Sequence, residues 1–93
     1  MDKKEVLLVY ERLANLTEKM AKEAQAKNWQ SFEQLESVCA REVNGVKNKP
    51  VPALEGKQRL RKVDLLKQIL ANDRAIRDAT ESAKISSREL VHH

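Results

Sequence analysis

The sequence predicts an all-α fold, in which an antiparallel helical hairpin is followed by a longer third helix. Two observations lead to this prediction. Apolar residues recur every three to four positions over long stretches, and every glycine and proline lies within residues 45–56, GVKNKPVPALEG. With 93 residues, the chain is close to the lower size limit for a single hydrophobic core without disulfides or metals. We therefore expect one helical domain over residues 1–93.

The first predicted helix covers about residues 4–27. Its apolar residues fall within an arc about 120° wide when the chain is projected at 100° per residue, which indicates one buried face. Leu7 and Leu8 lie outside this arc, so they are either covered by another helix or available to a partner. The arc comprises Val6, Val9, Tyr10, Leu13, Leu16, Met20 and Ala24.

The second predicted helix covers about residues 29–47, and Asn28 is a favourable N-cap for it. Its apolar residues again share an arc of about 120°. The short connection predicts an antiparallel hairpin with Trp29 and Phe32 at its closed end. A loop should follow at residues 48–56, because Pro50 and Pro52 lack amide donors. The apolar arc of the second predicted helix comprises Trp29, Phe32, Leu35, Cys39, Val43 and Val46.

The third predicted helix covers about residues 56–83 and would be about 42 Å long. Its apolar arc spans about 180°, whereas packing on a two-helix hairpin requires closer to 100°. This helix therefore has more apolar surface than the hairpin can cover. The weakly patterned tail, residues 84–93, should be flexible, although Ser86 or Ser87 could begin a short fourth helix.

The stretch KQILANDRAIRD places Asn72 and Asp73 where the apolar pattern of the third helix should continue. The helix could break there, the polar pair could fix helix packing, or it could meet a partner. The 3.6-residue register continues from Ile69 to Ile76, which favours an unbroken helix. Asp73 falls inside the apolar arc, as does Glu36 in the second helix. Asp73 is spaced for an i,i+4 pair with Arg77, but an exposed pair of this kind contributes only about 0.2–0.5 kcal/mol. Two further roles are therefore open for both carboxylates: pairing with a cation of a neighbouring helix, or recognition of a partner.

Composition excludes several classes of protein. Cys39 is the only cysteine, so no intramolecular disulfide or cysteine-based zinc site can form. No apolar run approaches the roughly 18 residues of a membrane span, and the charged N-terminus is unlike a signal peptide, so we expect a cytoplasmic protein with no membrane insertion. His92 and His93 are the only histidines and could be remnants of an affinity tag. We predict no metal, no cofactor and no catalytic residues, and hence no enzyme.

Basic charge is concentrated in the second half of the chain. Residues 1–45 hold 7 basic and 8 acidic side chains, whereas residues 46–93 hold 11 and 6. The run KQRLRK at residues 57–62 is either a docking patch for an acidic partner or nucleic acid, or a solvated helix surface. Without a helix-turn-helix spacing, direct nucleic-acid binding is a minor option, and we expect none.

Two segments resemble the FliT family of flagellar type III export chaperones. These are NWQSFEQLE, with Trp29 and Leu35-Glu36, and LLKQILANDRAIR, with Ile69-Leu70, Asn72-Asp73 and Ile76. The resemblance runs from about residue 5 to residue 80. It implies a helical hairpin with a long helix that holds the filament cap protein in an export-competent state before secretion. It also implies, as further partners, the flagellar master transcriptional regulator and the export ATPase complex.

The resemblance and the wide apolar arc together predict a docking surface on the third helix for an amphipathic segment of the client. Members of the family commonly continue into a C-terminal helix that covers this surface, but a Pro-Trp start of such a helix is absent at Ser82-Ala83. Self-association as a homodimer is therefore one alternative, and a helical adaptor acting mainly on a DNA-binding regulator is another. The predicted partner-binding residues are Leu66, Ile69, Leu70, Asp73, Ile76 and Arg77.

Overall fold

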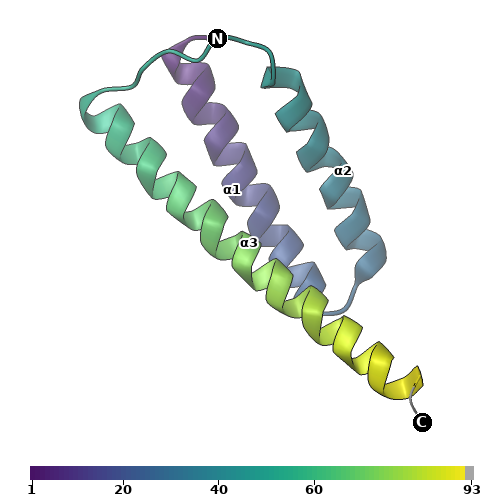
Figure 1. Ribbon diagram of the computed structural model, residues 1–93. Helices are drawn as coiled ribbons and strands as arrows, with labels where there is room; N and C mark the ends of the chain where they lie inside the picture. The colour runs from purple at the N-terminus through teal and green to yellow at the C-terminus, as the bar shows by residue number, and fades with distance from the viewer. Residues whose placement is uncertain (92–93) are drawn as a thin grey trace.

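A computed structural model of the chain describes the backbone of residues 1–91 and the side chains of residues 1–83. Over this range the chain forms three helices: α1 (Lys3–Gln25), α2 (Trp29–Val46) and α3 (Gly56–Val91) (Figure 1). The predicted all-α class, the antiparallel hairpin and the long third helix are confirmed. None of the described helices has an apolar stretch long enough to cross a bilayer.

Both ends of α1 are closed by local hydrogen bonds. At its start, the Asp2 carboxylate accepts a hydrogen bond from the Glu5 amide at 2.8 Å, and Glu5 adds negative charge to the first turn. At its end, Lys27 adopts a left-handed conformation with φ 62°. The amides of Lys27 and Asn28 donate to the carbonyls of Ala24 and Glu23 at 3.1 and 2.9 Å. This Schellman-type closure turns the chain toward α2, although no glycine marks the position.

The start of α2 differs in detail from the sequence-based expectation. Asn28 occupies the N-cap position, but its side chain makes no capping hydrogen bond, and its backbone carbonyl accepts from the Phe32 amide at 3.1 Å. Trp29 and Phe32 pack edge to face, with ring centroids 5.6 Å apart. Both rings remain half-buried, so they line the closed end of the hairpin without being enclosed by it.

The third helix is longer than predicted. It begins at Gly56, which has a φ of 58°, and continues to Val91, beyond the predicted end near residue 83. Ser86 and Ser87 lie within this helix, so over the described backbone they do not begin a separate fourth helix. The physical reason is that no glycine or proline follows Gly56 to interrupt the helix. His92 and His93 lie outside the described residues.

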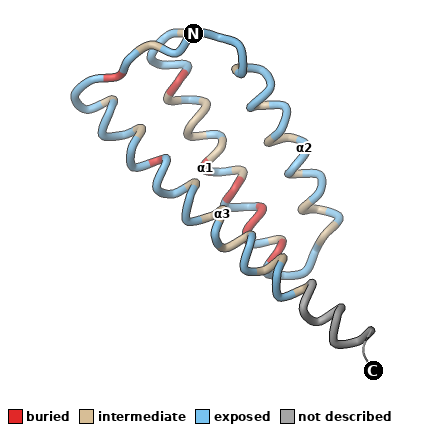
Figure 2. Tube along the Cα trace, in the orientation of Figure 1, coloured by how far each residue is buried: buried red, intermediate tan, exposed pale blue. Residues whose placement is uncertain are grey.

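Helix α1 lies between the other two helices (Figure 1). It is antiparallel to α2 and parallel to α3, and over the described residues the backbones of α2 and α3 do not approach each other. The molecule is elongated, with extents of 56 × 22 × 18 Å. Figure 2 shows that most buried residues lie along α1. The buried apolar residues are Val6, Ala14, Met20, Ala21, Ala24, Leu54 and Leu65.

Candidate functional site

Helix α3 divides its apolar residues between two faces. One face packs on α1 and is centred on Leu65, which is only 2% exposed. Ile69 and Ile76 follow Leu65 at helical spacing and are half-buried on the same face. The wide apolar arc of the sequence thus exceeds what α1 covers, and the remaining apolar residues face outward.

The outward-facing apolar residues form a continuous row, which we call the outer stripe of α3. Its members are Leu60, Val63, Leu66 and Leu70. Their exposed fractions are 70%, 40%, 38% and 59%, so each leaves a large part of its side chain in contact with water. Single exposed apolar residues are common on protein surfaces, but four on one helix face at spacings of three to four residues make a contiguous patch.

Asn72 connects α3 to α1. Its amide Nδ2 donates to the Thr17 hydroxyl at 3.1 Å and to the Ala14 carbonyl at 3.3 Å. The Thr17 hydroxyl in turn donates within α1 to the Leu13 carbonyl at 2.8 Å. Because Thr17 is buried, these bonds satisfy polar groups inside the interface between the two helices. Of the three explanations for the polar pair, helix packing therefore applies to Asn72.

Asp73 behaves differently from its neighbour. Its carboxylate pairs with Arg77 on the same helix at 2.7 Å, and the side chains of Arg77 and Asp73 are 74% and 44% exposed. Helix α3 is unbroken here, so a helix break at this position is wrong. The expected pairing with a cation of another helix is not seen for Asp73, nor for Glu36, which is exposed and forms no ion pair among the described side chains.

The six predicted partner-binding residues are therefore split by the structure. Leu66 and Leu70 belong to the outer stripe, and the Asp73–Arg77 pair lies one turn further along α3. Ile69 and Ile76 are half-buried on the face that packs on α1. The sequence-based selection missed Leu60 and Val63, which precede Leu66 at helical spacing. The helical spacing of three to four residues between Leu60, Val63, Leu66 and Leu70 could have identified these two residues from the sequence.

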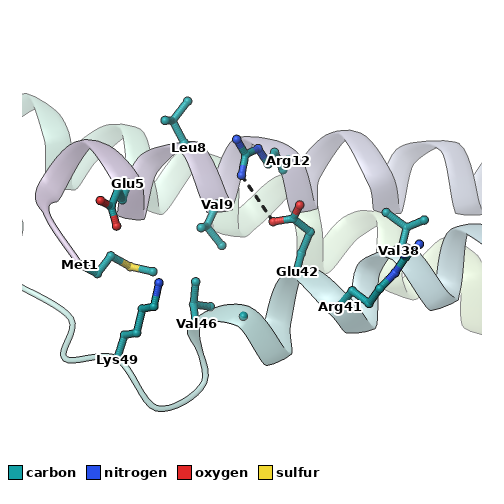
Figure 3. Close-up of a pocket in the computed structure, with 11 residues that line it drawn as sticks. Met1, Glu5, Leu8, Val9, Arg12, Val38, Arg41, Glu42, Val46 and Lys49 are labelled. Atoms are coloured by element: carbon teal, nitrogen blue, oxygen red, sulfur yellow. Dashed lines mark ion pairs between the residues drawn. The ribbon is translucent and has the colours of Figure 1, made fainter.

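A second surface feature is an open hollow of about 740 Å³ between the first half of α1 and the second half of α2 (Figure 3). Its apolar part includes Leu8 and Val9 from α1 and Val38 and Val46 from α2. The ion pair between Arg12 and Glu42, 3.6 Å apart, crosses from one helix to the other (Figure 3). The lining mixes apolar side chains with charges of both signs and brings together no nucleophile and base.

Cys39 is half-buried on α2, and its pKa is raised above the ordinary value. The largest cause is burial, to which the negative charges of Glu36 and Glu42 add. A raised pKa keeps the sulfur as a thiol at neutral pH and makes it a poor nucleophile. Within residues 1–83, no cluster of His, Cys, Asp or Glu side chains could hold a metal ion.

Comparison with known proteins identifies the family. The family model described as "Flagellar protein FliT" matches residues 8–92, nearly the whole chain. No curated protein and no solved structure matched the sequence. The matched region contains all three helices almost completely, including the outer stripe and the Asn72–Thr17 contact. The chain therefore belongs to the FliT family, which makes it a flagellar export chaperone.

Proposed function

We propose that this chaperone binds the flagellar filament cap protein in the cytoplasm before secretion, through the outer stripe of α3. The observation that carries the proposal is the row of four large apolar residues that remain exposed on α3. An amphipathic helix of the client would pack on α3 and cover this row. Binding would keep an aggregation-prone segment of the client shielded until export.

Location and rigidity of the stripe support this role. Leu66 directly follows Leu65 and Leu70 lies one turn further on, and the burial of Leu65 against α1 holds this part of α3 in place. A client helix would therefore dock on a surface that already has its bound shape, which reduces the ordering cost of binding. Leu66, Leu70, Asp73 and Arg77 are the residues that we propose to contact the client. Ile69 and Ile76 would support them from the half-buried face.

The test is binding of the C-terminal segment of the filament cap protein to the purified chain, measured by isothermal titration calorimetry. The double substitution Leu66→Asp/Leu70→Asp should abolish binding while circular dichroism shows an unchanged helix content. Leu8→Asp is the matched control, because Leu8 is also exposed, at 47%, but lies in the hollow between α1 and α2. No binding by the unmodified chain at tens of micromolar would refute the proposal, as would equal losses in both variants.

The master transcriptional regulator and the export ATPase complex are further partners under the same proposal. A protein that acts mainly on the regulator, as an adaptor or a dimerisation module, would give a different pattern in the same experiment. The Leu66→Asp/Leu70→Asp variant would then lose the regulator while the cap-protein segment remained bound. Measuring both partners with each variant separates the two functions.

A further inference from the structure

Cations accompany the outer stripe along its whole length. Arg59 directly precedes Leu60, Lys67 lies one turn from both Val63 and Leu70, and Arg74 follows one turn after Leu70. All three are exposed, and none forms an ion pair with the side chains of residues 1–83. Two other basic residues of α3 are already engaged: Arg61 pairs with Glu11 and Asp64, and the Lys62 ammonium lies 5.8 Å from the centre of the Tyr10 ring.

The acidic residues nearest these cations form no ion pair with them among the described side chains, and this includes Asp78, four residues after Arg74. Asp64 pairs with Arg61 and accepts a hydrogen bond from Gln68 at 3.0 Å, on the side of α3 that borders Glu11 of α1. The carboxylate of Asp73 is neutralised by Arg77. Between residues 59 and 77 the outer stripe therefore carries uncompensated positive charge beside exposed apolar groups.

The spacing of these residues matches the contact pattern of a helix pair. Val63, Leu66, Leu70, Asp73 and Arg77 are separated alternately by three and four residues, the spacing of the a and d positions in a coiled-coil seam. With this assignment, Lys67 and Arg74 take e positions, which flank the seam. In paired helices the flanking charges select the partner, and a polar seam position selects the register.

From this arrangement we infer that the outer stripe takes an amphipathic helix with an apolar seam and acidic flanking residues. The inference rests on the proposed function, since it describes the client segment that the same surface would bind. Glutamate or aspartate side chains beside the seam would meet Lys67 and Arg74. The seam would be apolar opposite Val63, Leu66 and Leu70, and polar opposite the Asp73–Arg77 pair.

Two other occupants fit less well. A second copy of α3 packed antiparallel would bring its own Lys67 and Arg74 against the same cations, which like-charge repulsion disfavours. Nucleic acid would compensate the cations, but it offers nothing to cover the valine and leucine side chains between them. The aromatic side chains Tyr10, Trp29 and Phe32 all belong to α1 and α2, so none of them stands on the outer stripe to stack on a base.

Two synthetic peptides with identical leucine seams test the inference, one flanked by glutamate and the other by lysine. We expect the glutamate peptide to bind the full chain at least about tenfold more tightly at low salt, with an affinity that falls as salt screens the charges. The Lys67→Glu/Arg74→Glu variant should reverse the preference. Lys3→Glu/Lys4→Glu, which makes the same change in net charge at the start of α1, should leave it intact.

The outcomes separate this inference from the proposed function. Equal binding of the two peptides, or an unchanged preference in Lys67→Glu/Arg74→Glu, would overturn the inference even if the cap-protein segment binds. Displacement of the glutamate peptide by duplex DNA would also overturn it. If the glutamate peptide binds and the cap-protein segment does not, the inference holds and the assignment of the client fails.

Discussion

Helix α1 packs on its two neighbours in different ways. Its contact with α3 includes the buried Leu65 and a hydrogen-bonded polar link between Asn72 and Thr17. Its contact with α2 contains no fully buried residue from α2 and is bridged by the partly exposed Arg12–Glu42 ion pair. The comparison indicates that α1 and α3 form the stable unit of the fold, and that α2 is attached to this unit more weakly.

The largest expected difference between the two contacts comes from removing one leucine from each. Leu65→Ala should destabilise the protein by about 2–5 kcal/mol, because it leaves a cavity at a site that is 2% exposed. Leu35→Ala on α2 should cost clearly less, because Leu35 is only half-buried and water can replace the lost side chain. Urea unfolding followed by circular dichroism measures both. Equal losses would mean that α2 is as tightly packed as α3.

A smaller effect is expected from the polar link. Asn72→Ala should destabilise the protein by about 1–2 kcal/mol, because two hydrogen bonds to α1 are lost. Asp73→Ala is the matched neighbouring control and should change stability by no more than about 0.5 kcal/mol, the usual value of an exposed i,i+4 pair.

The Thr17→Val variant completes this test as a double-mutant cycle with Asn72→Ala. Thr17→Val removes the hydroxyl that accepts from Asn72, so the two substitutions should be non-additive by about 0.5 kcal/mol or more. Additive losses would indicate that the two side chains stabilise α1 and α3 separately. The link would then contribute nothing to the difference between the two contacts.

The smallest effect concerns pH and the weaker contact. The pKa of Cys39 is raised in the folded protein, so the unfolded thiol ionises at lower pH than the folded thiol. The thiol therefore contributes its full stabilisation below the pKa of the unfolded state, which is about 8.5–9. This contribution is lost as the pH rises through the higher pKa of the folded state. Unfolding curves of the unmodified protein and of Cys39→Ala should converge in this alkaline range. If the difference in unfolding free energy between the two proteins stayed constant with pH, the pKa of the thiol would not be raised by folding.

Much of the fold could be predicted from the sequence because helix periodicity is a local property. The restriction of Gly45, Pro50, Pro52 and Gly56 to one stretch located the loop, and the arcs of apolar residues located the helices on either side. The continuation of α3 to Val91 was missed, because the apolar pattern weakens after residue 83 although nothing in the chain interrupts the helix. The left-handed Lys27 was also not predicted, since lysine rarely marks such a turn.

The candidate site shows where local information ends. The width of the apolar arc on α3 already indicated surplus apolar surface, and the structure leaves Leu66 and Leu70 of this arc exposed. The sequence could not decide which part of the arc α1 would cover, because that depends on how the helices cross. The structure placed Ile69 and Ile76 on the covered side and left Leu60 and Val63 exposed.

The adjacent residues Asn72 and Asp73 illustrate the difference between local pattern and tertiary contact. Helical periodicity alone predicts that both lie on an unbroken helix, because the apolar register continues past them, and that Asp73 is spaced to pair with Arg77. The contact of Asn72 with Thr17, a residue 55 positions earlier in the chain, is visible only in the folded molecule. A hydrogen bond across such a distance depends on the relative placement of α1 and α3, which helical periodicity does not encode. Asp73 takes no part in that contact and pairs with Arg77 of its own helix.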